Sequence, residues 1–95
     1  MSAPSSQHAE RAIRIATKFH EARSTLKTLT SKEAYPKIIA DCREVISATI
    51  EHGADDVMDA VRILIKAATD RGDGISAMWL MAAAVEMIEG EGDGS

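Results

Sequence analysis

Cysteine, proline and aromatic residues are scarce in this chain of 95 residues. Cys42 is the one cysteine, which excludes a disulfide framework and a cluster of thiolate metal ligands, and a reducing compartment is therefore expected. The chain has only one Trp, one Tyr and one Phe, so its core must consist of aliphatic side chains and alanine. Such a core suits closely packed helices better than strands, and the sequence predicts an all-α protein.

A long hydrophobic run and an export signal are also missing. The most apolar stretch, residues 75–88, reads ISAMWLMAAAVEMI. As a helix it would extend about 21 Å at ~1.5 Å per residue, well short of the ~30 Å core of a bilayer. The polar start MSAPSSQ lacks the basic and then apolar residues of a secretory signal. We therefore expect no membrane segment and a cytoplasmic protein.

No Gly or Pro interrupts residues 6–29, where apolar residues recur at the spacing of one helix face: Ala12, Ile15, Phe19, Ala22, Leu26 and Leu29. Three shorter helices are expected at 36–52, 57–70 and 75–88. The inward residues of the second are expected to be Ile38, Ile39, Cys42, Val45, Ile46 and Ile50. Because the links are short, the prediction is a compact, mostly antiparallel four-helix bundle with a long N-terminal helix.

The ends of these helices carry recognisable signals. Thr30 and Glu33 have the spacing of a capping box, and Pro36 is expected at the first position of the second helix. Carboxylates are expected to cap the third and fourth helices: Asp55 or Asp56, and Asp73. The chain is thus divided into a flexible start at 1–5, one helical domain at 6–89 and a disordered, acidic, Gly-rich tail at 90–95.

Residues 75–88 are apolar on two sides of the expected helix. One row is formed by Met78, Met81, Val85 and Ile88, and the other by Ser76, Leu80, Ala83 and Met87. One interpretation is the central helix of a four-helix fold. The other is an interface with a second copy or a partner, because Met is adaptable and Trp is frequent in interfaces. This second hypothesis predicts a homo-oligomer that associates through Met78, Trp79, Leu80, Met81 and Met87.

Signals for catalysis and for metal binding are weak. The three histidines have no spacing typical of a metal site, and no motif places a histidine beside Cys42. No glycine loop of the phosphate-binding kind is present, and the paired carboxylates fit helix caps and solvated faces. We therefore expect no enzyme activity, no cofactor and no metal.

Charge is divided unevenly along the chain. Residues 1–38 carry seven Lys or Arg against three Asp or Glu, whereas residues 39–95 carry four against twelve. The division indicates either attraction of the first helix to the rest of the bundle or charged faces that meet a partner. Five acidic residues gather around the turn between the second and third helices and are predicted to bind a partner with a basic surface: Glu44, Glu51, Asp55, Asp56 and Asp59.

A basic stripe gives an alternative. Arg11, Arg14 and Lys18 follow one side of the first helix and can hold phosphates. Three charges without an interleaved aromatic residue, in a protein of net charge −4, argue against nucleic acid as the main partner. This alternative is a binding module for an anionic small ligand or nucleic acid.

The pattern as a whole predicts a non-enzymatic module for protein–protein interaction, a small acidic helical adaptor or inhibitor that blocks a partner's surface. In size and charge the chain resembles the small inhibitors that phages carry against host defence, such as anti-CRISPR-like proteins. That resemblance implies a protein of the host as the partner.

Overall fold

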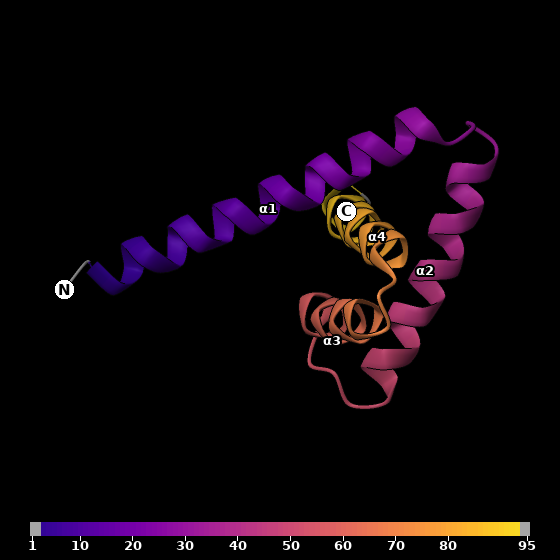
Figure 1. The fold of residues 1–95 in the computed structure, drawn as a ribbon. Coiled ribbons are helices and arrows are strands. Elements are labelled where there is room, and N and C mark those ends of the chain that lie inside the picture. Colours follow the sequence, from indigo (N-terminus) through magenta and orange to yellow (C-terminus); the bar gives the residue numbers. More distant parts are fainter. Residues whose placement is uncertain (1–2, 94–95) are drawn as a thin grey trace.

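The structure, a computed structural model, describes the backbone of residues 3–93 and the side chains of residues 16–89. Over this part the chain forms four α-helices and no strand (Figure 1). The helices are α1 (Ala3–Leu29), α2 (Ala34–Glu51), α3 (Val57–Asp70) and α4 (Gly74–Asp93). The all-helical fold class is confirmed.

α4 lies at the centre of the fold. It contacts each of the other three helices, and α2 also contacts α3. Figure 1 shows α4 nearly end-on, with α1 and α3 on opposite sides of it and α2 along a third side. Because three helices surround α4, its consecutive residues Ala82, Ala83 and Ala84 are completely buried. The first interpretation of residues 75–88, a central helix, therefore holds for the middle of α4.

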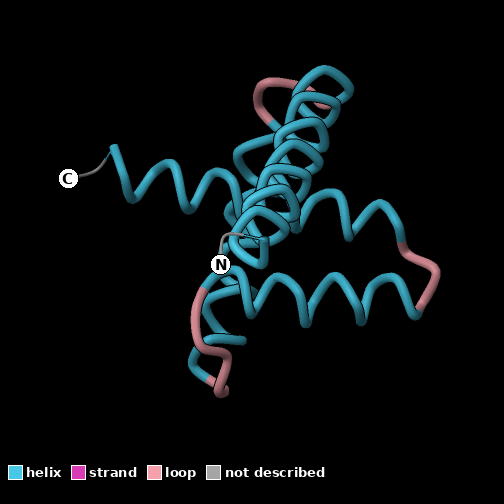
Figure 2. Tube along the Cα trace, turned by 90° about the vertical axis from the view of Figure 1, so that its left-hand side faces the viewer, coloured by secondary structure: helices cyan, strands magenta, loops and turns pink. Residues whose placement is uncertain are grey.

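The helices do not all run along one another. α3 and α4 lie side by side in both views and run in opposite directions, whereas α1 and α2 cross α4 (Figures 1 and 2). A mostly antiparallel arrangement is therefore not confirmed for the whole bundle. Short links require that successive helices are neighbours, but they leave the crossing angle to the packing of the side chains.

Each outer helix turns one apolar face towards α4. Ile46 of α2 and Val61 of α3 are the largest side chains with no exposed surface, and Ala22 and Leu26 supply the buried face of α1. Of the expected core residues whose side chains are described, two are outside this core, and that part of the prediction is wrong; the side chains of Ala12 and Ile15 lie outside the described residues. Leu29 is 77% exposed because α1 ends there, and Val45 is 48% exposed because it lies at the edge of the buried face of α2.

Carboxylates cap α3 and α4 as the sequence predicts. Asp56 caps α3, where its Oδ1 accepts a hydrogen bond from the Asp59 backbone N–H at 2.8 Å. At α4, Asp73 accepts from the Ser76 backbone N–H at 3.1 Å and from the Ser76 hydroxyl at 2.6 Å. These bonds satisfy donors that have no partner within the helix.

The predicted start of α2 needs a correction. The side chain that accepts there belongs to Ser31, whose Oγ lies 3.1 Å from the Ala34 backbone nitrogen, and Thr30 and Glu33 form no capping box. α2 begins at Ala34, so Pro36 is inside the first turn and not at the first position. The first turn tolerates proline because its N–H groups have no helical partner.

The expected flexible ends remain a prediction. α1 begins at Ala3 and α4 ends at Asp93, so helical backbone extends into both of the segments 1–5 and 90–95. The side chains of these segments lie outside the described residues.

Asp73 gives a prediction about pH. The hydrogen bonds from Ser76 hold the pKa of Asp73 below its ordinary value of 3.8. A carboxyl whose pKa is lowered by folding contributes stability above its unfolded pKa and loses that contribution as the pH falls through its folded pKa. Urea unfolding should therefore show wild type to be more stable than Asp73→Asn at neutral pH, with the difference narrowing below pH 3.8. A difference that stays constant with pH would contradict the charge-assisted cap.

Candidate functional site

The five acidic residues predicted to bind a partner lie on α2 and around the turn from α2 to α3. Glu44 and Glu51 are exposed and seven residues apart, so they share one side of α2. Asp55 and Asp56 are exposed in the turn, and Asp59 is half-buried in the first turn of α3. The chain thus places these carboxylates on two adjoining elements.

Three of these residues also stabilise the start of α3. Besides the cap formed by Asp56, the Oδ2 atom of Asp59 accepts from the Asp55 backbone N–H at 3.0 Å. Asp59 Oδ1 also lies 3.4 Å from the Arg62 guanidinium. Asp59 is therefore largely occupied within the chain, whereas within residues 16–89 no ion pair involves Glu44 or Glu51.

Residues 41–59, which we call the acidic segment, hold six Asp or Glu and a single Arg. Of these acids, Asp59 alone forms an ion pair within the described residues, and its partner Arg62 lies one turn further along α3. The excess of negative charge in this segment is therefore left at the surface of α2 and of the turn that follows it.

Glu86 and Glu89 of α4 are used differently, because they pair with α1 and α2. Arg23 of α1 lies 2.7 Å from Glu89 and 3.9 Å from Glu86, and His20 lies 3.5 Å from Glu89. The Tyr35 hydroxyl of α2 donates to Glu86 at 2.8 Å. The hydrogen bond from Arg23 lowers the pKa of Glu89, and burial followed by the bond to Glu86 raises the pKa of Tyr35.

Sequence reasoning missed this network, although a signal for it existed. The opposite net charges of residues 1–38 and 39–95 indicated attraction between the first helix and the rest of the chain. The Arg23 contacts to α4 are one case of that attraction. Glu86 and Glu89 could not be chosen from the sequence, because the choice depends on where α1 crosses α4.

The basic stripe of the alternative hypothesis lies on α1. The backbone of α1 includes Arg11, Arg14 and Lys18, and Lys18 is exposed. The side chains of Arg11 and Arg14 lie outside the described residues. An anionic ligand at this stripe remains a prediction.

The residues of α4 predicted to form an oligomer interface are divided by the fold. Leu80 and Met81 are buried in the chain's own core and leave little surface for a partner. Met78, Trp79 and Met87 are half-buried and pack against that core. Self-association through α4 remains a prediction, and in the single chain these three residues offer more surface for it than Leu80 and Met81 do.

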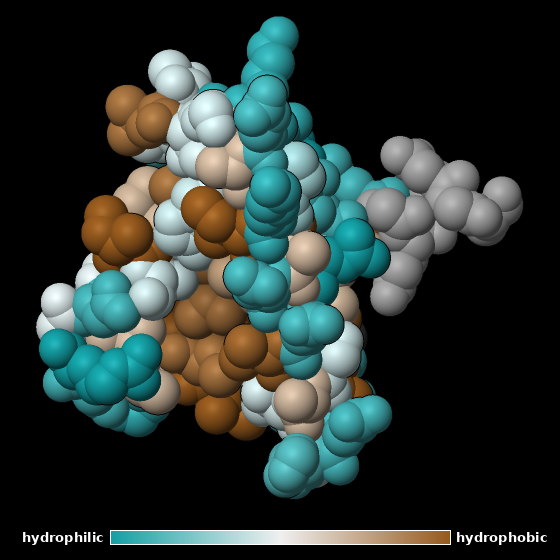
Figure 3. Space-filling view, turned by 90° about the vertical axis from the view of Figure 1, so that its right-hand side faces the viewer, coloured by the Kyte–Doolittle hydropathy of each residue, from teal (hydrophilic) through white to brown (hydrophobic). Residues whose placement is uncertain are grey.

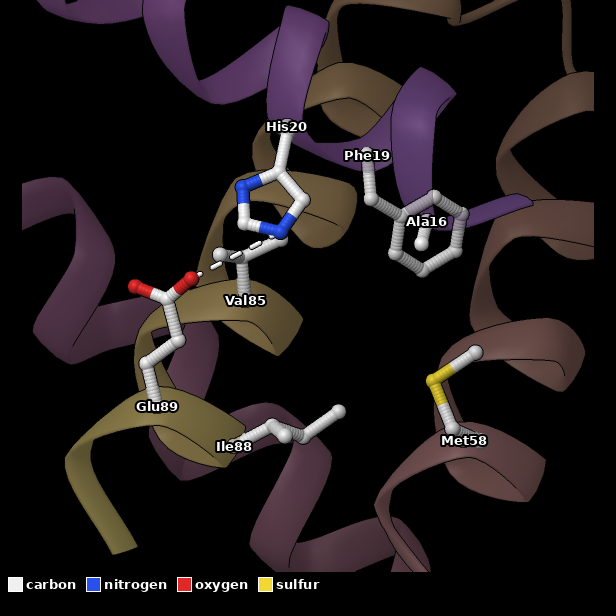
Figure 4. Close-up of a pocket in the computed structure, with 7 residues that line it drawn as sticks. All are labelled: Ala16, Phe19, His20, Met58, Val85, Ile88 and Glu89. Carbon is white, nitrogen blue, oxygen red and sulfur yellow. Dashed lines mark ion pairs between the residues drawn. The ribbon is translucent and has the colours of Figure 1, made fainter. Parts of the chain in front are cut away.

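A hollow of about 290 Å³ opens between α1, α3 and α4 (Figure 4). Phe19, Met58 and Ile88 point into it, while His20 and Glu89 pair at its edge. Ala16 of α1 also lines it, and the next positions of that helix face towards the N-terminus have side chains outside the described residues. Because part of its surroundings is not described, no partner is inferred for this hollow.

A second hollow, of about 330 Å³, lies between α2, α3 and α4. We call it the α2 groove, and it is lined by Ile38, Asp41, Cys42, Val45, Leu64, Ala67, Arg71, Ser76, Trp79 and Leu80. Figure 3, which looks onto α2, shows a hydrophobic area bordered by a row of hydrophilic residues. The α2 groove contains the only Cys and the only Trp of the chain.

Cys42 is a weak nucleophile in the α2 groove. Burial, and to a lesser degree the neighbouring Asp41 carboxylate, raise the pKa of its thiol. The reactive thiolate is therefore disfavoured at neutral pH, and the side chain behaves as a small apolar group. This environment suits an apolar contact surface better than covalent chemistry.

No metal site is found in the described part of the chain, where no three His, Cys, Asp or Glu side chains are grouped to hold an ion. None of the described helices is long and apolar enough to cross a bilayer. The expected absence of a cofactor and of enzyme activity remains a prediction. Comparison of the chain with models of protein families, with curated proteins and with solved structures finds no match.

Proposed function

We propose that this chain is a non-enzymatic protein-binding module of the cytoplasm, a small acidic helical adaptor or inhibitor with a long first helix. It would cover a basic surface of another protein. The observation that carries the proposal is the acidic segment, which contains six carboxylates and only one arginine and whose carboxylates on α2 are exposed. A surface of one sign attracts a surface of the other and speeds association.

The acidic segment is held on a fixed support. α2 is anchored by the buried side chains of Ile39 and Ile46, and the cap of α3 fixes the turn that carries Asp55 and Asp56. Charges on a fixed support lose little conformational freedom on binding, and this favours recognition of a partner. Glu86 and Glu89, in contrast, are engaged with Arg23.

Blocking is the simplest action for such a surface. A basic surface on a partner is often one that binds nucleic acid, and an acidic helical domain placed on it would compete for the same charges. In this form the chain would act like the phage-encoded inhibitors of host defence that it resembles in size and charge, including anti-CRISPR-like proteins.

The test is to neutralise acids that have no capping task. In the variant Glu44→Gln/Glu51→Gln/Asp55→Asn the cap residues Asp56 and Asp59 are unchanged. Proteins captured by wild type would be identified by mass spectrometry, purified and tested with both chains. We expect the association rate to fall by about 10-fold or more for the variant and to depend less on salt. Wild type should also displace nucleic acid from the partner.

The matched control removes the same number of charges of the other sign, in Arg11→Gln/Arg14→Gln/Lys18→Gln. This variant should bind the protein partner at least as fast as wild type. Equal association rates for wild type and the acid-neutral variant would overturn the proposal. Loss of binding in the control alone would favour the anionic-ligand alternative.

A further inference from the structure

We infer that the α2 groove receives the apolar side of a basic amphipathic helix of the partner protein, with the Lys and Arg residues of that helix over α2. The inference rests on the proposed function and names the part of the partner that is recognised. It is carried by the shape of the groove, its apolar lining and the position of its charges.

The walls of the α2 groove have the length of a short helical segment. Ile38, Cys42 and Val45 follow one side of α2 over about two turns, roughly 10 Å at 1.5 Å per residue. Leu64 and Ala67 form the facing wall on α3. A helix that binds in a groove presents anchors at i, i+3 or i+4, and i+7, which is the same length.

One aliphatic side chain that lines the groove, and another one helical turn from Trp79, are exposed to water. Val45 is 48% exposed and lines the groove, although the pattern of α2 predicts that it is buried. Ile75 is 64% exposed and lies one turn before Trp79, on the same side of α4. An apolar occupant would cover these surfaces and gain free energy from their burial.

The charged residues in and beside the groove indicate the charge of the occupant and its orientation. Asp41 lines the groove on the α2 wall, and Glu44 and Glu51 continue the negative charge along the same helix. The lining also includes Arg71, at the C-terminal end of α3, whose guanidinium lies 4.0 Å from the Asp73 carboxylate. The basic side chains of the partner helix should therefore lie over α2 and away from Arg71.

The same charges argue against two copies of the chain that meet groove to groove. Within the acidic segment a copy offers a single arginine against six carboxylates. Two acidic segments brought together through their grooves would repel each other. A basic helix from a different protein brings no such repulsion.

Because Trp79 and Cys42 are the only Trp and Cys of the chain and both line the groove, their signals report on its occupancy. We would titrate the full chain with a synthetic helical peptide that has leucine along one face and lysine elsewhere. The expected result is a change in Trp79 fluorescence and slower modification of Cys42 by a thiol reagent. A second peptide, with glutamate in place of lysine, should give neither effect.

Two variants test the location. Val45→Lys places an ammonium group at the apolar edge of the groove, where it is also repelled by the lysine peptide, and should weaken binding of that peptide by about 10-fold or more. Ile63→Lys adds the same charge and is the matched control, because Ile63 is 50% exposed on α3 and does not line the groove. Circular dichroism would establish that both variants fold. An unchanged Trp79 fluorescence signal up to the highest peptide concentration would overturn the inference. Equal losses of affinity for the lysine peptide in the two variants would overturn it as well.

The inference and the proposed function can fail separately. If the acid-neutral variant loses the natural partner and Val45→Lys binds it like wild type, the inference is wrong and the function stands. Light scattering tests whether a second copy of the chain is the occupant. If wild type is a dimer and Val45→Lys a folded monomer, a second copy fills the groove and the inference is overturned.

Discussion

Ile46→Ala is expected to lower the free energy of unfolding by about 2–5 kcal/mol, a large share of the ~5–15 kcal/mol typical of a small domain. Ile46 has no exposed surface and belongs to the core cluster shared by α2, α3 and α4. The substitution removes three carbon atoms and leaves a cavity that helices on several sides cannot close at once. Urea unfolding followed by circular dichroism measures the change.

The neighbouring residue supplies the control. Val45→Ala removes two carbon atoms from a side chain that is half exposed at the edge of the α2 groove. Its effect on unfolding should be well below 1 kcal/mol, because surface substitutions rarely exceed ~0.5 kcal/mol. If both variants lose the same free energy of unfolding, Val45 must be as deeply buried as Ile46, which would contradict the structure.

Local signals explain why the helices and two of their caps could be predicted. Asp56 and Asp73 bind backbone groups three residues further on, so residue type and spacing are sufficient to identify them. Ser31 was missed in favour of Thr30 because both hydroxyls precede the same turn and the sequence does not say which one begins it. Residue type and spacing therefore predicted the start of α2 to within a few residues, but not which side chain accepts the hydrogen bond there.

The candidate site depends on contacts that no local pattern contains. Ile38, Leu64 and Trp79 come from three helices, and they line one groove because α2 crosses α3 and α4. Val45 matches an inward position in the helical pattern, yet the crossing leaves it at the edge. The side of α2 that is apolar could be predicted, but the width of its buried face depends on the neighbouring helices.

Charge links these observations to the proposed function. The pairing of Arg23 with Glu86 and Glu89 holds α1 against α4, so part of the negative charge in residues 39–95 has a structural role. The acidic segment has far less internal compensation within residues 16–89, and it borders the α2 groove at Asp41. An apolar groove beside uncompensated carboxylates is a surface for a basic amphipathic partner.

Ala82→Leu should separate the two interpretations of residues 75–88 by stability alone. Ala82 belongs to neither of the two apolar rows in the sequence, yet it is completely buried. With α1, α2 and α3 all in contact with α4, three added carbon atoms must displace a helix, at a cost of about 1–3 kcal/mol. Urea unfolding would measure the loss.

Ala48→Leu is the matched control, because Ala48 is exposed on α2 and the same added volume would extend into water. Its effect should stay within about 0.5 kcal/mol. If Ala82→Leu is also tolerated, one side of α4 must be free in the isolated chain. That side would then be available to a second copy, and the oligomer interface at Met78, Trp79 and Met87 would regain its support. If Ala82→Leu is destabilising, that side of α4 is enclosed by its own chain, and a partner surface formed by α2 and its groove is favoured over one on α4.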